Sequence, residues 1–124
     1  MSQAKHILVV DDSDVIRRVA ASLLARMGYR VSEAANGQEA LEHCRAHMPD
    51  AVLLDWHLPV MGSIEFLEFM RADSNGDRPY VIYCTSEHDV EDITRALNSG
   101  ANEYLMKPFD RAAIESKLVE CGLR

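Results

Sequence analysis

The sequence predicts an α/β fold in which a doubly wound, five-stranded parallel sheet is covered by helices on both faces. Strand-like and helix-like segments alternate along all 124 residues. The strand-like segments are continuous apolar runs instead of alternating apolar and polar residues, which is typical of a sheet buried on both sides. The length is that of one ordinary domain, so we expect residues 1–124 to form a single domain.

The first half of the chain contains two strand-helix units. Residues 6–10 read as a buried strand, and the apolar residues after it recur at a helical period up to Gly28, which is expected to end the helix. A second strand is expected over residues 29–34. Asn36 then caps a helix, with Glu39 three residues on as its reciprocal partner. The periodic apolar residues of the first helix are Val15, Ile16, Val19, Ala20, Leu23, Leu24 and Met27.

The second half continues the same alternation. The remaining strands are expected over residues 51–54, 79–84 and 103–106. A helix should begin near Ser63, another should end at Gly100, and the last should bury Ile114 and Leu118. With the strand order 2-1-3-4-5, the fold would be flavodoxin-like, and its ligand site would lie beyond the ends of strands one and three.

Composition limits the possible partners and location. The chain carries 13 basic and 20 acidic side chains, a formal net charge of -7, which disfavours binding to nucleic acid or to an anionic membrane. No apolar stretch approaches the roughly 18 residues of a membrane span, so we expect a cytoplasmic protein. The three cysteines, Cys44, Cys84 and Cys121, lack paired spacing and are expected to be reduced packing residues without zinc.

Carboxylates stand where two strands of this predicted sheet end. Asp11 and Asp12 follow the first strand, and Asp55 follows the third. Three converging carboxylates would raise one another's pKa values unless a cation lies between them. A set of oxygen ligands without His or Cys favours a hard ion, and two or three carboxylates completed by water suit Mg²⁺ better than Ca²⁺.

The other strand ends add a hydroxyl, Thr85, and an ammonium, Lys107. Together with the acids they form a plausible site for phosphoryl transfer, in which Asp55 is the nucleophile and forms an acyl phosphate. Lys107 and the metal would spread the charge of the transferring group. Thr85 would hydrogen-bond a phosphoryl oxygen. Taken singly, each residue also has an ordinary explanation, such as helix capping by Asp12 or a solvated Lys107.

At these residues the chain resembles the receiver domains of response regulators in two-component signalling, from about Lys5 to Leu123. Asp11 and Asp12 match the acidic metal-binding pair, and Asp55 matches the phosphoacceptor. The other matches are Thr85 with the switch hydroxyl, Tyr104 with the switch aromatic, and Lys107-Pro108 with the lysine and its following proline. Five elements in the right order, each at a predicted strand end, make the resemblance specific.

The resemblance implies a function and a set of ligands. Phosphoryl would come from a histidine kinase or a histidine phosphotransfer protein, with Mg²⁺ bound by Asp12, Asp55 and the main-chain carbonyl of His57, while Asp11 holds the ion through water or orients the site. A cis peptide would precede Pro108. Phosphorylation would draw Thr85 inward, let Tyr104 turn in, and change the face formed by the fourth helix, fifth strand and fifth helix, where a downstream protein binds.

Two local features bear on this expectation. The family usually has Asp-Gly where Gly62-Ser63 stand here, so we expect altered loop geometry beside Asp55 without loss of the site. His57 and Glu87 lie two residues beyond the phosphoacceptor and the switch hydroxyl. We hypothesise that they set the lifetime of the acyl phosphate, which their joint substitution would test by its effect on dephosphorylation.

Several functional alternatives remain open. Because the sequence ends at Arg124, just after the last helix, we expect a stand-alone receiver, monomeric or dimeric on activation, that signals without being an enzyme and assists its own phosphotransfer and dephosphorylation. It could be a chemotaxis-type regulator or a phosphorelay intermediate. An aspartate-nucleophile phosphatase would need an acid where His57 stands. A flavodoxin-like electron carrier would need a phosphate loop after the first strand, where acids stand instead.

Overall fold

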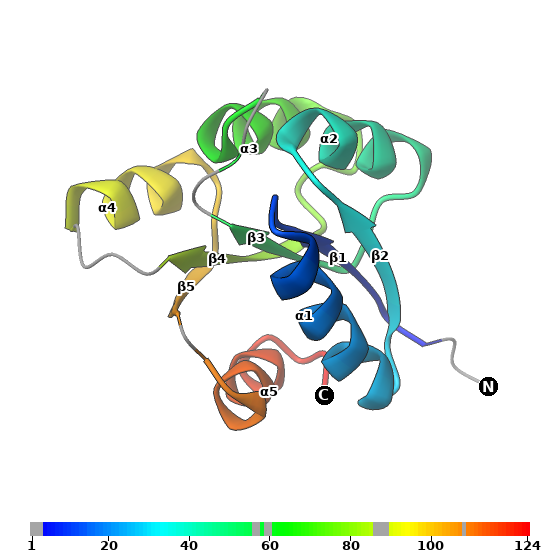
Figure 1. Cartoon of the computed structure of the whole chain (residues 1–124). Helices are drawn as coiled ribbons and strands as arrows, with labels where there is room; N and C mark the ends of the chain where they lie inside the picture. The colour runs from blue at the N-terminus through cyan, green and yellow to red at the C-terminus, as the bar shows by residue number, and fades with distance from the viewer. Residues whose placement is uncertain (1–3, 56–57, 59–60, 86–89, 108) are drawn as a thin grey trace.

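Five parallel strands form one sheet in the order β2-β1-β3-β4-β5, which confirms the predicted topology (Figure 1). The computed structural model describes residues 4–55, 58, 61–85, 90–107 and 109–124. The strands are β1 (His6–Val10), β2 (Arg30–Ala34), β3 (Ala51–Asp55), β4 (Tyr80–Thr85) and β5 (Glu103–Met106).

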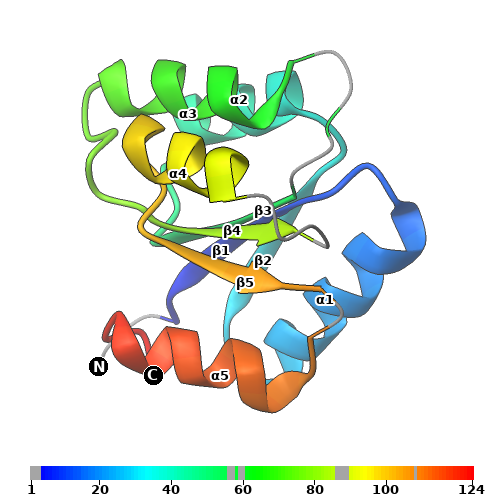
Figure 2. The same cartoon turned by 90° about the vertical axis from the view of Figure 1, so that its left-hand side faces the viewer.

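Helices cover both faces of this sheet. One face carries α2 (Gly37–Ala46), α3 (Ser63–Ala72) and α4 (Val90–Ser99), and the other carries α1 (Asp14–Arg26) and α5 (Arg111–Glu120). Figure 2 shows the two layers above and below the sheet, seen along its edge at β5. This is the doubly wound arrangement that the alternation of strands and helices predicts.

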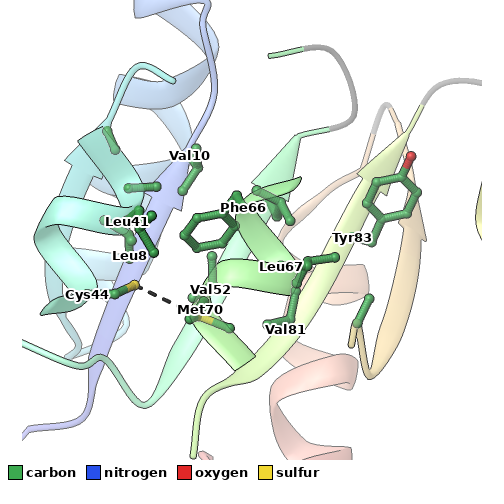
Figure 3. Packing of buried hydrophobic residues seen from close by; sticks show 14 of the residues in the cluster. Leu8, Val10, Leu41, Cys44, Val52, Phe66, Leu67, Met70, Val81 and Tyr83 are labelled. Carbon is green, nitrogen blue, oxygen red and sulfur yellow. Dashed lines mark hydrogen bonds between the residues drawn. The ribbon is translucent and has the colours of Figure 1, made fainter. Parts of the chain in front are cut away.

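Side chains of the strands alternate between two cores, one under each helical layer. Leu8, Val52 and Val81 point to the α2–α3–α4 side, whereas Ile7, Ala51 and Ile82 point to the α1–α5 side. Figure 3 shows the first of these cores, where Phe66 and Leu67 of α3 pack against the strands. All five residues of β1 and of β3 are buried, which explains why these segments are apolar throughout.

The predicted helix boundaries are confirmed by their caps. Gly28 and Gly100 have φ values of 99° and 125°, which favour glycine after a helix. The Asn36 side chain accepts a hydrogen bond from the Glu39 main-chain N–H, and the Glu39 carboxylate reaches back to the N–H of Ala35.

Two strands end one residue later than predicted. Asp55 is the last residue of β3 and Thr85 is the last residue of β4, and both are paired in the sheet. The second and fourth strands begin one residue later than predicted, at Arg30 and Tyr80 instead of residues 29 and 79. The two polar residues proposed for the site are therefore held by strand hydrogen bonds and not by loops.

The apolar stripe of α1 is buried along only part of its length. Ala20 and Leu24 lie in the core with α5 residues, whereas Val15 and Val19 are 72% and 63% exposed. The exposed half borders a groove of about 440 Å³ that also reaches Lys107 and Phe109. The N-terminal half of α1 thus presents an apolar surface next to the ends of the strands.

Arg71, in the last turn of α3, connects this helix to the two chain segments that follow α3 and α4. Its guanidinium donates hydrogen bonds to the carbonyls of Gly76, Pro79 and Gly100 and to the side chain of Asn102. These acceptors belong to the α3–β4 loop and to the α4–β5 turn. One side chain therefore fixes the end of α4 relative to α3.

The cysteines are packing residues, as predicted. Cys44 and Cys84 are buried, Cys121 is half-buried, and all three are free thiols. Burial raises the pKa of Cys44 to about 12, so its thiol stays protonated at neutral pH. Among the described residues, the structure contains no helix that is both long enough and apolar enough to cross a membrane.

Candidate functional site

Three carboxylates meet where β1 and β3 end side by side. Val10 pairs with Leu54 in the parallel register, so the residues that follow them, Asp11 and Asp55, are neighbours. Asp11, Asp12 and Asp55 each offer one carboxylate oxygen within 4.8 Å of the others. Asp11 and Asp55 are buried and Asp12 is exposed. The convergence predicted from the sequence is present.

Lys107 supplies a positive charge to this cluster. Its Nζ donates hydrogen bonds to Asp55 Oδ1 at 2.5 Å and to Asp11 Oδ2 at 3.0 Å. Its main-chain N–H donates to the carbonyl of Thr85, which places the side chain across the strand ends. Burial disfavours the ammonium form, but the hydrogen bonds and charges of Asp55 and Asp11 outweigh burial and raise the pKa of Lys107. The side chain is therefore a fixed cation at neutral pH.

Burial also disfavours the charged form of Asp55, but for a carboxyl group this means a higher pKa. Burial raises the pKa of the Asp55 carboxyl, against the hydrogen bond and charge of Lys107, and the negative charges of Asp11 and Asp12 add to that rise. The single positive charge of Lys107 does not neutralise the negative charges of Asp11, Asp12 and Asp55. The cluster therefore favours a further cation.

The first acid of the pair is held firmly by its surroundings. Asp11 Oδ1 accepts a hydrogen bond from the N–H of Ser13, and its other oxygen accepts from Lys107. Arg17 donates to the Asp11 main-chain carbonyl at 2.9 Å and forms ion pairs with Asp14 and Glu33. Both carboxylate oxygens of Asp11 are thus engaged in hydrogen bonds, and whether it orients the site stays a prediction.

Asp12 has a different setting. It is exposed, and the N-cap of α1 is Ser13, whose hydroxyl accepts from the N–H of Ile16. Helix capping therefore does not require Asp12. Among the described residues the cluster is the only group of three or more His, Cys, Asp or Glu that could hold a metal ion, and all its ligands are oxygens. This donor set fits Mg²⁺, with Asp12 and Asp55 able to bind it directly.

The remaining predicted residues lie around this centre. Thr85 is buried at the end of β4, next to Cys84, which pairs with Asp55. Tyr104 lies on β5 and is 40% exposed. His57, Glu87 and Pro108 fall outside the described residues, so the predicted carbonyl ligand, the lifetime-tuning pair and the cis peptide stay predictions.

Two residues near the site were not anticipated from the sequence. Arg17 holds the Asp11 carbonyl, as described above. The buried hydroxyl of Ser63 donates a hydrogen bond to the main-chain carbonyl of Asp55 at 2.5 Å. The sequence predicted altered loop geometry at Gly62-Ser63 but no contact of the Ser63 side chain. A hydroxyl at the start of a helix whose preceding residue has no side chain is the only signal that could have suggested it.

Known proteins are similar to this chain in sequence and in fold. The family model described as the response regulator receiver domain matches residues 7–119. Chemotaxis protein CheY1 of Helicobacter pylori is 37% identical over 114 residues, which cover 90% of this chain and 92% of that protein.

Among the solved structures that match, two illustrate a similarity over almost the whole length of both chains. CheY4, a chemotaxis protein of Vibrio cholerae, has 30% identity and a TM-score of 0.90, covering 95% of this chain and 98% of that chain. The receiver domain of sensor histidine kinase PA1611 from Pseudomonas aeruginosa has 34% identity and a TM-score of 0.88, covering 95% and 97%. The PA1611 structure contains a magnesium ion coordinated in the active-site cleft.

Proposed function

Because this chain belongs to the family of response regulator receiver domains, we propose that it accepts a phosphoryl group on Asp55 from a histidine of a kinase or phosphotransfer protein, with the help of Mg²⁺. The observation that carries the proposal is the Asp55 carboxylate at the end of β3, hydrogen-bonded by Lys107 and flanked by two further carboxylates. The chain would act as a signalling phosphoacceptor that assists its own phosphotransfer and dephosphorylation.

The reaction follows from this geometry. A carboxylate oxygen of Asp55 attacks the phosphorus, the phosphorus–nitrogen bond to the donor histidine breaks, and an acyl phosphate forms. Lys107 donates a hydrogen bond to Asp55 Oδ1, so its ammonium would lie where the charge of the transferring group develops. Asp11 keeps Lys107 at this position through its second hydrogen bond. Bound Mg²⁺, held by Asp12, Asp55 and the carbonyl predicted at His57, would neutralise the carboxylates and the phosphoryl oxygens.

Signal output would follow from the residues beside the acyl phosphate. Thr85, buried at the end of β4, would hydrogen-bond a phosphoryl oxygen. Tyr104 is 40% exposed here and would turn inward as Thr85 moves. These shifts would change the face made by α4, β5 and α5, which we propose as the surface for a downstream protein.

The phosphodonor would approach from a different side. The exposed apolar half of α1 and Phe109 border a groove that includes Lys107, the residue bonded to the phosphoacceptor. A donor protein seated on this groove would bring its histidine close to Asp55. The input and output surfaces would then be separate, so that one does not block the other.

The chemistry is testable by intact mass. Incubation with acetyl phosphate and Mg²⁺ should add one phosphoryl group, and chelation of the metal should prevent it. Asp55→Asn should abolish the adduct. Asp50→Asn should keep it, because Asp50 directly precedes β3 at the strand's amino end. An adduct that persists at wild-type level in Asp55→Asn would refute the proposal.

A chemotaxis-type regulator and a phosphorelay intermediate differ in the fate of the phosphoryl group. The similarity to CheY1 and CheY4 over nearly their full lengths favours the chemotaxis-type role. The phosphorylated chain can be mixed with histidine phosphotransfer proteins to decide. Rapid passage of the label to one of them would favour the relay role.

A further inference from the structure

The phosphoacceptor strand and the following helix are joined directly by one hydroxyl. Ser63, the first residue of α3, donates its Oγ–H to the main-chain carbonyl of Asp55 at 2.5 Å. Ser63 is 3% exposed and Asp55 is 8% exposed, so water competes little for this bond. The bond spans eight residues and closes the loop that follows the phosphoacceptor.

A second contact restrains the same loop near its end. A Cβ on Gly37, at the start of α2, would clash with the main-chain oxygen of Met61. The backbone just before α3 therefore packs against α2 at a distance that only glycine allows. With Ser63 bonded to Asp55, both ends of the loop are held to rigid elements.

Capping of α3 does not account for Ser63. The N-cap of this helix is Gly62, which has no side chain to accept a hydrogen bond from the first turn. Ser63 lies inside the helix, where serine offers no advantage in helix propensity. Its hydroxyl reaches out of the helix to the end of β3, so its effect falls on the strand that carries the acceptor.

We infer that Ser63 is a positioning residue for phosphoryl transfer, an inference that rests on the proposed role of Asp55. Fixing the Asp55 carbonyl restricts the ψ angle of Asp55 and so holds the end of β3 that presents its carboxylate to Lys107. The carbonyl expected to bind Mg²⁺ belongs to residue 57, inside the loop that Ser63 closes. Loss of the hydroxyl should therefore weaken metal binding and slow phosphorylation together.

The test compares Ser63→Ala with a matched control, Tyr29→Phe. Tyr29 also donates a hydroxyl to a main-chain carbonyl, that of Leu123 at 2.8 Å, but near the amino end of the sheet. Mg²⁺ affinity is read from the fluorescence of Trp56, which follows Asp55 in sequence, and phosphorylation from the rate of adduct formation with acetyl phosphate. Both variants lose one hydrogen bond of the same kind.

The expected result is an approximately tenfold weaker Mg²⁺ affinity in Ser63→Ala, in line with losses seen when groups that orient metal ligands are removed. Tyr29→Phe should bind Mg²⁺ like the wild type, and Ser63→Thr, which keeps the hydroxyl, should stay within about twofold of it. Equal affinities in Ser63→Ala and Tyr29→Phe would overturn the inference. A wild type that binds Mg²⁺ without accepting phosphoryl would instead refute the proposed function.

Discussion

At the carboxyl end of the sheet three carboxylates crowd around one ammonium, whereas at the amino end the carboxylate of Asp50 is shared between two donors. Asp50 Oδ2 accepts from the N–H of His6 at 2.8 Å, and its Oδ1 accepts from Arg78 at 3.3 Å. The main chain of Asp50 also bonds His6 and Tyr80. Polar groups at this end connect strands, while those at the other end are gathered around Asp55.

The carboxyl groups at the two ends of the sheet have pKa values shifted in opposite directions. Burial opposes ionisation of Asp50, but the His6 N–H and Arg78 outweigh it and lower the pKa of that carboxyl. Burial raises the pKa of Asp55 despite Lys107. The amino end therefore stabilises its charge, and the carboxyl end keeps an excess of negative charge that a metal ion can use.

The largest effect should come from removing the ammonium. Lys107→Met leaves Asp55 and Asp11 without their shared partner, and breaking a buried pair in this way should lower the free energy of unfolding by about 3 kcal/mol. Urea unfolding in the presence of a chelator measures the loss. Added Mg²⁺ should recover part of it. Unchanged stability without metal would mean that the carboxylates do not depend on Lys107.

Replacing an aspartate by asparagine should change the free energy of unfolding in opposite directions at the two ends of the sheet. Asp50→Asn should destabilise the protein by about 1–2 kcal/mol, because it weakens the hydrogen bonds from His6 and Arg78. Asp12→Asn should stabilise the metal-free protein by about 0.5 kcal/mol, since it relieves repulsion among the three carboxylates. Both values follow from urea unfolding without metal. A loss of stability in both variants would remove the contrast between the two ends.

A smaller effect is expected from histidines at the amino end. Burial lowers the pKa of His6 and of His43, whose Nε2 is buried without a hydrogen-bond partner in the described part of the chain. The charges of His47 and, for His6, of His43 and Arg30 act in the same direction, while Asp50 opposes them at His6.

Because the folded pKa values lie below the unfolded ones, the unfolded chain binds more protons, and stability falls as pH drops below about 6.5. His43→Leu should reduce the decline of the melting temperature between about pH 7 and pH 5 by a few degrees. Thermal unfolding across this range measures the difference. Parallel curves for wild type and variant would show that His43 does not contribute to the pH dependence.

Much of the fold and of the site could be predicted from the sequence, because buried parallel strands are continuous apolar runs and each run ends at a polar residue. Once the strand order is assumed, Asp11, Asp55 and Lys107 must meet at one edge of the sheet. Side-chain hydrogen bonds were harder to predict. The bond from Ser63 to Asp55 depends on how α3 begins, which sequence periodicity does not describe.

Which part of α1 is buried could not be predicted from the sequence either. Periodicity shows which side of a helix is apolar, but a neighbouring element must cover that side before it is buried. The C-terminal half of α1 shares a core with α5, and Val15 and Val19 remain exposed beside the groove at Lys107.

The hydrogen bonds of Arg71 have a mechanical consequence for the opposite edge of the molecule. They fasten the C-terminal end of α4 at Gly100 and Asn102 to the end of α3. If α4 moves, its C-terminal end would therefore stay in place, and the helix would rotate about that end. The displacement would grow toward Val90, the end of the helix that follows the strand carrying Thr85.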